Sequence, residues 1–152
     1  MRRPYVIGLI GLAIVLFLVI SAFLARAFSV GDAEQAAITD LVKAEAHGDT
    51  ARVVSLVSGC SADPACRARA SALTSTLRHA GAVRIAVINP SSTFSITSTL
   101  GTARVAWLAG SSLPRTQCVR VRHAGSVVQG FTVQLLKVSL RIVTDAACPK
   151  SF

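Results

Sequence analysis

The chain begins with an apolar run that is long enough to cross a lipid bilayer. Residues Val6–Ala25 include no charged side chain. At about 1.5 Å per residue, a helix of this length spans roughly 30 Å, the thickness of the hydrocarbon core of a bilayer. Because backbone N–H and C=O groups find no water in hydrocarbon, the run has to be helical despite its β-branched residues. The sequence therefore predicts an N-terminal transmembrane helix.

The charges that flank this run predict its orientation. Arg2, Arg3 and the α-amino group precede it, whereas only Arg26 directly follows it. Since positive charge favours the cytoplasmic side, we expect a cytoplasmic N-terminus and an extracytoplasmic C-terminal domain at the plasma membrane. The alternative is a cleaved signal peptide, because Ala25-Arg26-Ala27 fits a cleavage site after Ala27 and would give a secreted protein. Signal-peptide apolar regions are usually about 7 to 15 residues long, which favours the uncleaved anchor.

These features divide the chain into five parts. The expected cytoplasmic N-terminus covers residues 1–4, the transmembrane anchor covers 5–26, and a linker covers 27–31. An extracytoplasmic domain follows at 32–145, and residues 146–152 form a C-terminal tail. The part after the anchor has the size of one ordinary domain and can bury a core.

The part outside the membrane is basic. Of 16 Lys and Arg residues, three flank the anchor, which leaves 13 against 7 Asp and Glu. At a membrane, such charge is attracted to anionic lipids or wall polymers, although plain solvation is the alternative. Nucleic acid is disfavoured, because the cations are scattered singly and aromatic side chains are few. The residues expected to form a basic face are Arg104, Arg120, Arg122 and Arg141, with Arg84 and Lys137 as further candidates.

All four cysteines follow the apolar run: Cys60, Cys66, Cys118 and Cys148. Four cysteines allow three disulfide pairings. A turn separates Cys60 from Cys66, so a bridge between them is geometrically easy, and a Cys118–Cys148 bridge would tie the tail to a strand. We favour these two disulfides, which fit an oxidising compartment. A zinc site is the alternative, but neither pair has the usual two-to-four-residue gap.

Three helices are expected after the anchor, each following an Asp that can cap it. Their ranges are 33–46 after Asp32, 50–57 after Asp49, and 64 onward after Asp63, the last stopping at Gly81. Apolar residues at helical spacing mark their buried faces. These are Ala33, Ala37, Leu41 and Ala44 in the first helix, Val53, Val54 and Val57 in the second, and Cys66, Ala70, Leu73 and Leu77 in the third.

After the helices the apolar period changes to two, which predicts strands. The expected strands cover about 83–87, 93–99, 103–107, 117–123 and 131–142. In the last one, Leu135 and Leu136 belong to opposite faces, and each face continues with further apolar residues. Because one face must stay buried, this switch predicts a β-bulge near Leu135 and Leu136. The fold class is α+β, with a transmembrane helix followed by three helices packed on a curved antiparallel sheet in a cone-like arrangement.

Two parts of this expected fold are similar to those of a known superfamily. Ala46-His47-Gly48-Asp49 looks like its corner between two helices, and 118–122 with 131–136 look like its terminal hairpin. Over about residues 32–142 the order of elements resembles the nuclear transport factor 2-like, cystatin-like superfamily. Its membrane-anchored members include accessory proteins of actinobacterial lipid-import systems and assembly subunits of type IV secretion and conjugation machines. The resemblance thus implies a role in a cell-envelope assembly.

Enzymes of that superfamily, such as ketosteroid isomerases and dehydratases, place an acidic or His base and an oxyanion donor inside the cone. Here the only Tyr is Tyr5, beside the membrane span, and no expected strand contains Asp or Glu. Asp40 and His79 are the one acid–base pair to consider. We therefore expect no catalytic residue, no cofactor and no metal, and an isomerase or dehydratase is the least favoured interpretation.

The favoured interpretation is a non-catalytic interaction or scaffold domain that binds an envelope protein beside the membrane. The alternative is a binder of a small apolar ligand or lipid in the space between helices and sheet. Such a binder needs an open cavity of several hundred Å³. Its expected lining residues are Leu73, Leu77, Val105, Trp107, Val119 and Val121.

Overall fold

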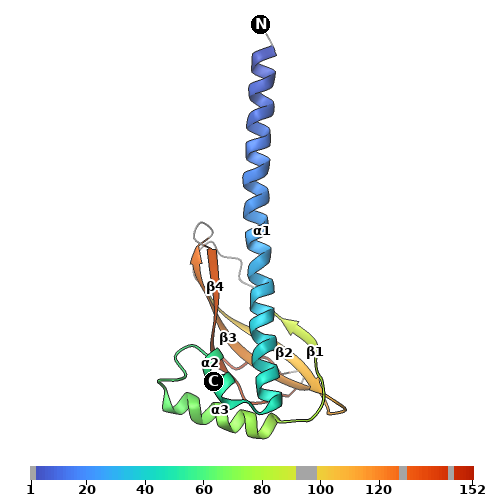
Figure 1. Cartoon of the computed structure of the whole chain (residues 1–152), viewed down its shortest axis with the longest axis vertical. Coiled ribbons are helices and arrows are strands. Elements are labelled where there is room, and N and C mark those ends of the chain that lie inside the picture. The colour runs from blue at the N-terminus through green and yellow to red at the C-terminus, as the bar shows by residue number, and fades with distance from the viewer. Residues whose placement is uncertain (1–2, 92–98, 127–129, 144–145) are drawn as a thin grey trace.

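The computed structural model describes residues 3–91, 99–126, 130–143 and 146–152 (Figure 1). Helices come first and an antiparallel sheet follows, so the α+β class is confirmed. One long helix extends far beyond the other elements, and the sheet and the two shorter helices gather around its C-terminal part (Figure 1). The cone-like arrangement stays a prediction.

Helix α1 runs without interruption from Arg3 to His47. It includes residues 27–31, which the sequence analysis treats as a linker, so the apolar run and the first domain helix are one element. This segment contains no proline, and its single glycine costs a helix only about 1 kcal/mol relative to alanine. Within α1, residues Val6–Ala25 are not buried by any other part of the chain that the structure describes. They are long and apolar enough to cross a membrane, a property that an anchor and a signal sequence share.

The continuity of α1 corrects two expectations about its domain half. Asp32 does not cap a helix, because the preceding turn already supplies carbonyl acceptors to the N–H groups there. The buried face includes Leu41 and Ala44 as predicted, and Ala37 packs against the core, but Ala33 is exposed and the face extends to Ile38 and Val42. The larger side chains decide the face because they remove more apolar area from water than alanine does.

The two short helices begin where the sequence predicts. In α2, Thr50–Leu56, the Asp49 carboxylate accepts a hydrogen bond from the Arg52 N–H at 2.9 Å. In α3, Pro64–Leu77, the Asp63 carboxylate accepts one from the Ala65 N–H at 2.9 Å. Both N-caps are therefore confirmed.

Helix α3 ends at Leu77, a few residues before Gly81. Past this point the His79 N–H donates to the Ala46 carbonyl, 2.9 Å away at the end of α1, which draws the chain out of the helix. The Leu77 carbonyl accepts instead from the Arg115 guanidinium at 3.0 Å. The C-terminal ends of α1 and α3 and the start of the third strand thus meet at one corner.

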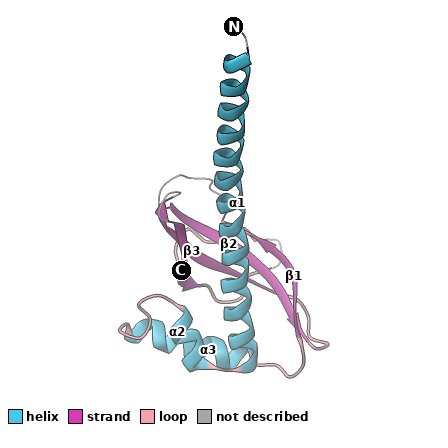
Figure 2. Cartoon of the chain, turned by 45° about the horizontal axis from the view of Figure 1, so that its top comes forward, coloured by secondary structure: helices cyan, strands magenta, loops and turns pink. Residues whose placement is uncertain are grey.

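The sheet has four strands in the order β1-β2-β3-β4, each antiparallel to its neighbour. Their bounds are Val83–Asn89, Thr99–Ala109, Arg115–Ser126 and Gly130–Val138. The domain half of α1 lies along one face of this twisted sheet, while α2 and α3 lie together at its end away from the apolar run (Figures 1 and 2). The expected strand at 93–99 lies outside the described residues except for Thr99, which begins β2.

The predicted β-bulge is confirmed at Leu136. Val121 of β3 pairs with Leu135 and the preceding Arg120 pairs with Lys137, so Leu136 is the extra residue. The bulge lets Leu135 and Val138 both point into the core, where they are 2 % and 5 % exposed.

Strand β4 is shorter than expected and ends at Val138. A side chain takes the place of a backbone acceptor at this end of the strand, because the Ser139 hydroxyl oxygen accepts from the Cys118 N–H at 2.8 Å. Beyond this point only an isolated bridge joins Ile142 to Thr116. The side-chain bond to the backbone competes with continuation of the strand.

Both favoured disulfides are present: Cys60–Cys66 and Cys118–Cys148. The first closes the turn between α2 and α3, and the second ties the tail to β3. Since all four cysteines are paired, none has a thiolate for the zinc alternative. The disulfides fit an oxidising, extracytoplasmic compartment.

The continuous helix makes a measurable prediction about distance. Spin labels can be placed at Ala22 and Lys43 of the full chain in nanodiscs as noncanonical amino acids, which leaves the four cysteines unchanged. The two labels should lie about 32 Å apart in a narrow distribution, because they are 21 residues apart along a helix. Double electron–electron resonance measures this distance. The matched variant Ser29→Pro removes a helical hydrogen bond and should shift or broaden the distribution. A broad distribution in the unmodified chain would contradict a continuous helix.

Candidate functional site

Basic side chains share the outer face of the sheet, opposite α1. Directly paired residues of an antiparallel sheet point to the same face. Arg104 pairs with Cys118, and Arg120 and Arg122 follow Cys118 at two-residue steps on β3. Lys137 pairs with Arg120 at the β4 edge. Arg84 joins this face from β1 by pairing with Leu108, so the structure brings five of the six expected cations together: Arg84, Arg104, Arg120, Arg122 and Lys137.

The sixth expected cation, Arg141, does not belong to this face. It follows the end of β4 and lies instead near Arg115, where its positive charge acts on the other guanidinium. Burial first, and the charge of Arg141 second, lower the pKa of Arg115. The expected position of Arg141 fails because β4 ends four residues earlier than its alternating pattern suggests.

The acidic residues are segregated from the sheet. None of the four strands contains Asp or Glu. Among the described residues, every Asp and Glu belongs to a helix or its cap: Asp32, Glu34, Asp40, Glu45, Asp49 and Asp63. The basic outer face therefore has no neutralising partner on its own strands.

The C-terminal tail covers part of this face. The Arg120 guanidinium donates to the Lys150 carbonyl at 2.7 Å and lies 5.3 Å from the centre of the Phe152 ring. The Cys118–Cys148 disulfide holds the tail beside Arg120. Arg84 and Arg122, on either side, remain exposed. The outer face is thus a basic surface with a short peptide fixed across its middle.

A buried polar cluster joins α1 to the sheet on the opposite, inner face. The Glu34 carboxylate accepts from the Ser91 N–H at 2.8 Å and from the Ser91 hydroxyl at 3.0 Å. His123 of β3 places its Nε2 atom 2.7 Å from the same carboxylate. Gly101 makes this packing possible, because a Cβ atom there would overlap the Ser91 side chain. All three polar residues are less than 10 % exposed.

This cluster has the composition of a hydrolase triad but not its geometry. In a triad the His lies between Ser and the acid and takes the proton from the Ser hydroxyl. Here Glu34 lies between Ser91 and His123, so no His nitrogen is placed to activate the hydroxyl. The arrangement is that of a clamp that satisfies a buried carboxylate with three partners.

A second buried acid on α1 lacks such partners. Glu45 is fully buried, and neither of its carboxylate oxygens has a hydrogen-bond partner among the described residues. Burial raises the pKa of Glu45 to about 7, and the neighbouring Gln117 side chain opposes this rise. The Gln117 amide is itself engaged, because its oxygen accepts from the Trp107 indole N–H at 2.7 Å.

These buried polar residues are not among the site residues expected from the sequence, although the sequence contains a signal for them. Gln117 and His123 share the parity of Val119 and Val121, which places all four on the inner face. Glu34 and Glu45 lie 4 residues before Ile38 and 4 residues after Leu41, on the same helical face. The parity and the 3.6-residue period together predict their burial.

Other expected site residues are not brought together. Asp40 lies 4.0 Å from the Arg52 guanidinium, whereas His79 lies 2.9 Å from that of Arg115, so the candidate acid–base pair takes separate partners. The six expected lining residues are at most 2 % exposed within the packed core, and a cleft between α2, α3 and β4 is lined by none of them. The described part of the chain contains no group of three potential metal ligands.

Comparison with models of protein families, with curated proteins and with solved structures finds no match for this chain. The function therefore has to be argued from the surfaces and contacts described above.

The clamp predicts a stability change in Glu34→Ala. This variant should lose about 3 kcal/mol of unfolding free energy, because it leaves Ser91 and His123 buried without their common partner. Denaturant unfolding of the full chain in nanodiscs can be followed by the fluorescence of Trp107, the only Trp. The neighbouring exposed residue provides the control Gln35→Ala, which should change stability by less than about 0.5 kcal/mol. Equal stability of the two variants would contradict the clamp.

The buried Glu45 predicts a dependence of stability on pH. Its folded-state pKa of about 7 lies above the ordinary value of 4.5, so the folded chain binds the proton more tightly than the unfolded chain does. The stabilisation that comes from this tighter proton binding is fully present below the ordinary pKa of 4.5 and is lost as the pH rises to about 7. The loss is on the order of 3 kcal/mol. Glu45→Gln should be more stable than the wild type at about pH 8, with the difference disappearing at about pH 4. A difference that does not change with pH would contradict the raised pKa.

Proposed function

We propose that the chain is an uncleaved single-pass membrane protein whose extracytoplasmic domain binds an acidic partner protein of the cell envelope through the basic outer face of its sheet. The apolar half of α1 supports a membrane span, and the two disulfides support an oxidising compartment. The flanking Arg2 and Arg3 support a cytoplasmic N-terminus. The domain is proposed to be a non-catalytic interaction or scaffold module.

The segregation of charge is the observation on which this proposal depends. Five cations share the outer face and none of the four described strands contains Asp or Glu, so no acidic side chain of the described strands offsets this positive charge. If these charges only kept the domain soluble, charges of both signs mixed on the same face would do so equally well. A one-sided potential instead steers an oppositely charged partner and selects against others.

The direction of this face favours a protein over lipid headgroups. Strand β3 begins beside the end of α1, where Arg115 contacts α3, and reaches back to Glu34 through His123. Glu34 lies nine helical residues, about 14 Å, beyond Ala25. Only the Arg122 end of the face therefore approaches the bilayer, and the rest extends away from it. An extended acidic surface of another envelope protein fits this direction better than a flat membrane does.

The resemblance to the nuclear transport factor 2-like, cystatin-like superfamily is part of this proposal. Membrane-anchored domains of that superfamily serve in envelope assemblies, and the proposed role is of the same kind. Anionic wall polymers are an alternative partner, which the test below distinguishes from protein because a protein adduct has a defined mass.

Site-specific crosslinking tests the proposed face. A photo-crosslinking residue at Thr102, which pairs with Arg120 on the outer face, should yield an adduct of defined mass in native membranes. The same residue at Ala72, exposed on α3, should yield none. The adduct at Thr102 should fall at least fivefold in the double variant Arg104→Gln/Arg122→Gln, because steering and binding both depend on charge.

The control for this experiment removes the same charge elsewhere. Lys43→Gln/Arg67→Gln lowers the net charge equally but changes only exposed helix residues, so its adduct should remain at the wild-type level. Loss of the adduct in both double variants would show a nonspecific charge effect and contradict the proposal. Equal crosslinking from Thr102 and Ala72 would do the same.

A further inference from the structure

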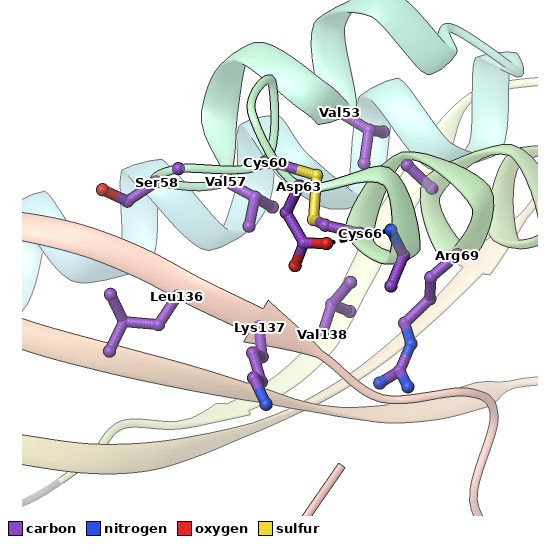
Figure 3. A pocket seen from close by; sticks show the side chains of 13 residues that line it. Val53, Val57, Ser58, Cys60, Asp63, Cys66, Arg69, Leu136, Lys137 and Val138 are labelled. Carbon is purple, nitrogen blue, oxygen red and sulfur yellow. Dashed lines mark hydrogen bonds between the residues drawn. A yellow bond between two sulfur atoms is a disulfide. The ribbon is translucent and has the colours of Figure 1, made fainter.

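A cleft of about 310 Å³ opens between α2, α3 and the end of β4 (Figure 3). Its apolar wall is formed by Val53 and Val57 of α2, Ala70 of α3 and Val138 of β4. The Cys60–Cys66 disulfide forms another part of the wall. The volume lies at the lower end of the range of small-molecule sites, which is roughly 300 to 1,000 Å³.

Two cations border this apolar space. Arg69 of α3 and Lys137 of β4 both line the cleft, and their charged ends project to the same side of it, away from the disulfide (Figure 3). No salt bridge joins either of them to a carboxylate of the described residues. Asp63 is the one acid of the lining, and one of its oxygens is already held by the Ala65 N–H at the start of α3.

The walls of the cleft are fixed by the fold. The disulfide closes the turn between α2 and α3, and the Ser58 N–H in that turn donates to the Leu135 carbonyl of β4 at 2.7 Å. The bulge at Leu136 then sets the direction in which Lys137 leaves the strand. Because covalent and backbone bonds hold both sides, a ligand would lose little binding free energy to ordering the site.

We propose that this cleft binds a small organic anion with a compact apolar body, such as a short-chain carboxylate. The apolar body would lie against Val53, Val57 and Val138, and the anionic group would face Arg69 and Lys137. An uncharged ligand of the same shape leaves the two cations unpaired, and a cationic one is repelled by them. This site is separate from the outer face through which the proposed protein partner binds, except that Lys137 stands at the edge between them.

The test compares ligands that differ only in charge. Hexanoate should bind the full chain in nanodiscs at millimolar concentration, and hexanamide should bind roughly tenfold more weakly, since charge-assisted hydrogen bonds are about twice as strong as neutral ones. Saturation-transfer NMR measures both, with empty nanodiscs as the background. Absence of binding by hexanoate, or equal binding of the two ligands, would overturn the proposal.

Three variants locate the binding. Arg69→Gln and Lys137→Gln should each weaken hexanoate binding about fivefold, because each removes one charged donor. Asp63→Asn should strengthen it a few-fold, because it removes a like charge while Asn still caps α3. Lys43→Gln, which changes an exposed charge on α1 away from the cleft, is the control and should bind as the wild type does. Unchanged binding in both Arg69→Gln and Lys137→Gln would overturn the assignment, whatever the crosslinking experiment on the outer face gives.

Discussion

Helix α1 has two halves with different surroundings, and the rest of the structure depends on how the helix is held where the two halves meet. The N-terminal half of α1 presents apolar side chains on all sides and has no packing partner among the described residues, whereas its C-terminal half has one buried face against the sheet. Glu34 lies just inside this second half, where its carboxylate is bonded to Ser91 and His123. This clamp fixes the point at which the helix leaves the domain. A rigid helix then holds the basic sheet face at a set distance from the apolar run.

The two buried acids of α1 show how context decides the effect of one residue type. Glu34 and Glu45 lie eleven residues apart, which is three helical turns, and so face the sheet together. Glu34 meets an N–H, a hydroxyl and an imidazole, while Glu45 meets a Gln117 side chain that is already engaged with Trp107. The first acid therefore joins distant parts of the chain, and the second is held at a cost that grows as it ionises.

Local signals predicted much of the fold and little of its polar interior. The caps Asp49 and Asp63, the bulge at Leu136 and the disulfides are set by neighbours in sequence or by the alternating pattern, and each is confirmed. The Glu34 clamp joins residues 57 and 89 positions apart, so no local pattern names its partners. The cleft depends likewise on how α3 meets β4. The end of β4 was missed because the Ser139 hydroxyl replaces a backbone bond that the alternating pattern leads one to expect.

The proposed role requires an intact helix that joins a membrane span to a disulfide-bonded domain. Intact-mass spectrometry of the chain, extracted from its native membrane without reductant and with thiols blocked, tests both parts at once. We predict the mass of the full chain reduced by about 4 Da, with no blocking group attached, because two disulfides remove four hydrogens. The mass of a chain that begins at Phe28 would contradict an uncleaved anchor. A mass that includes thiol-blocking groups would contradict a disulfide-bonded, extracytoplasmic domain.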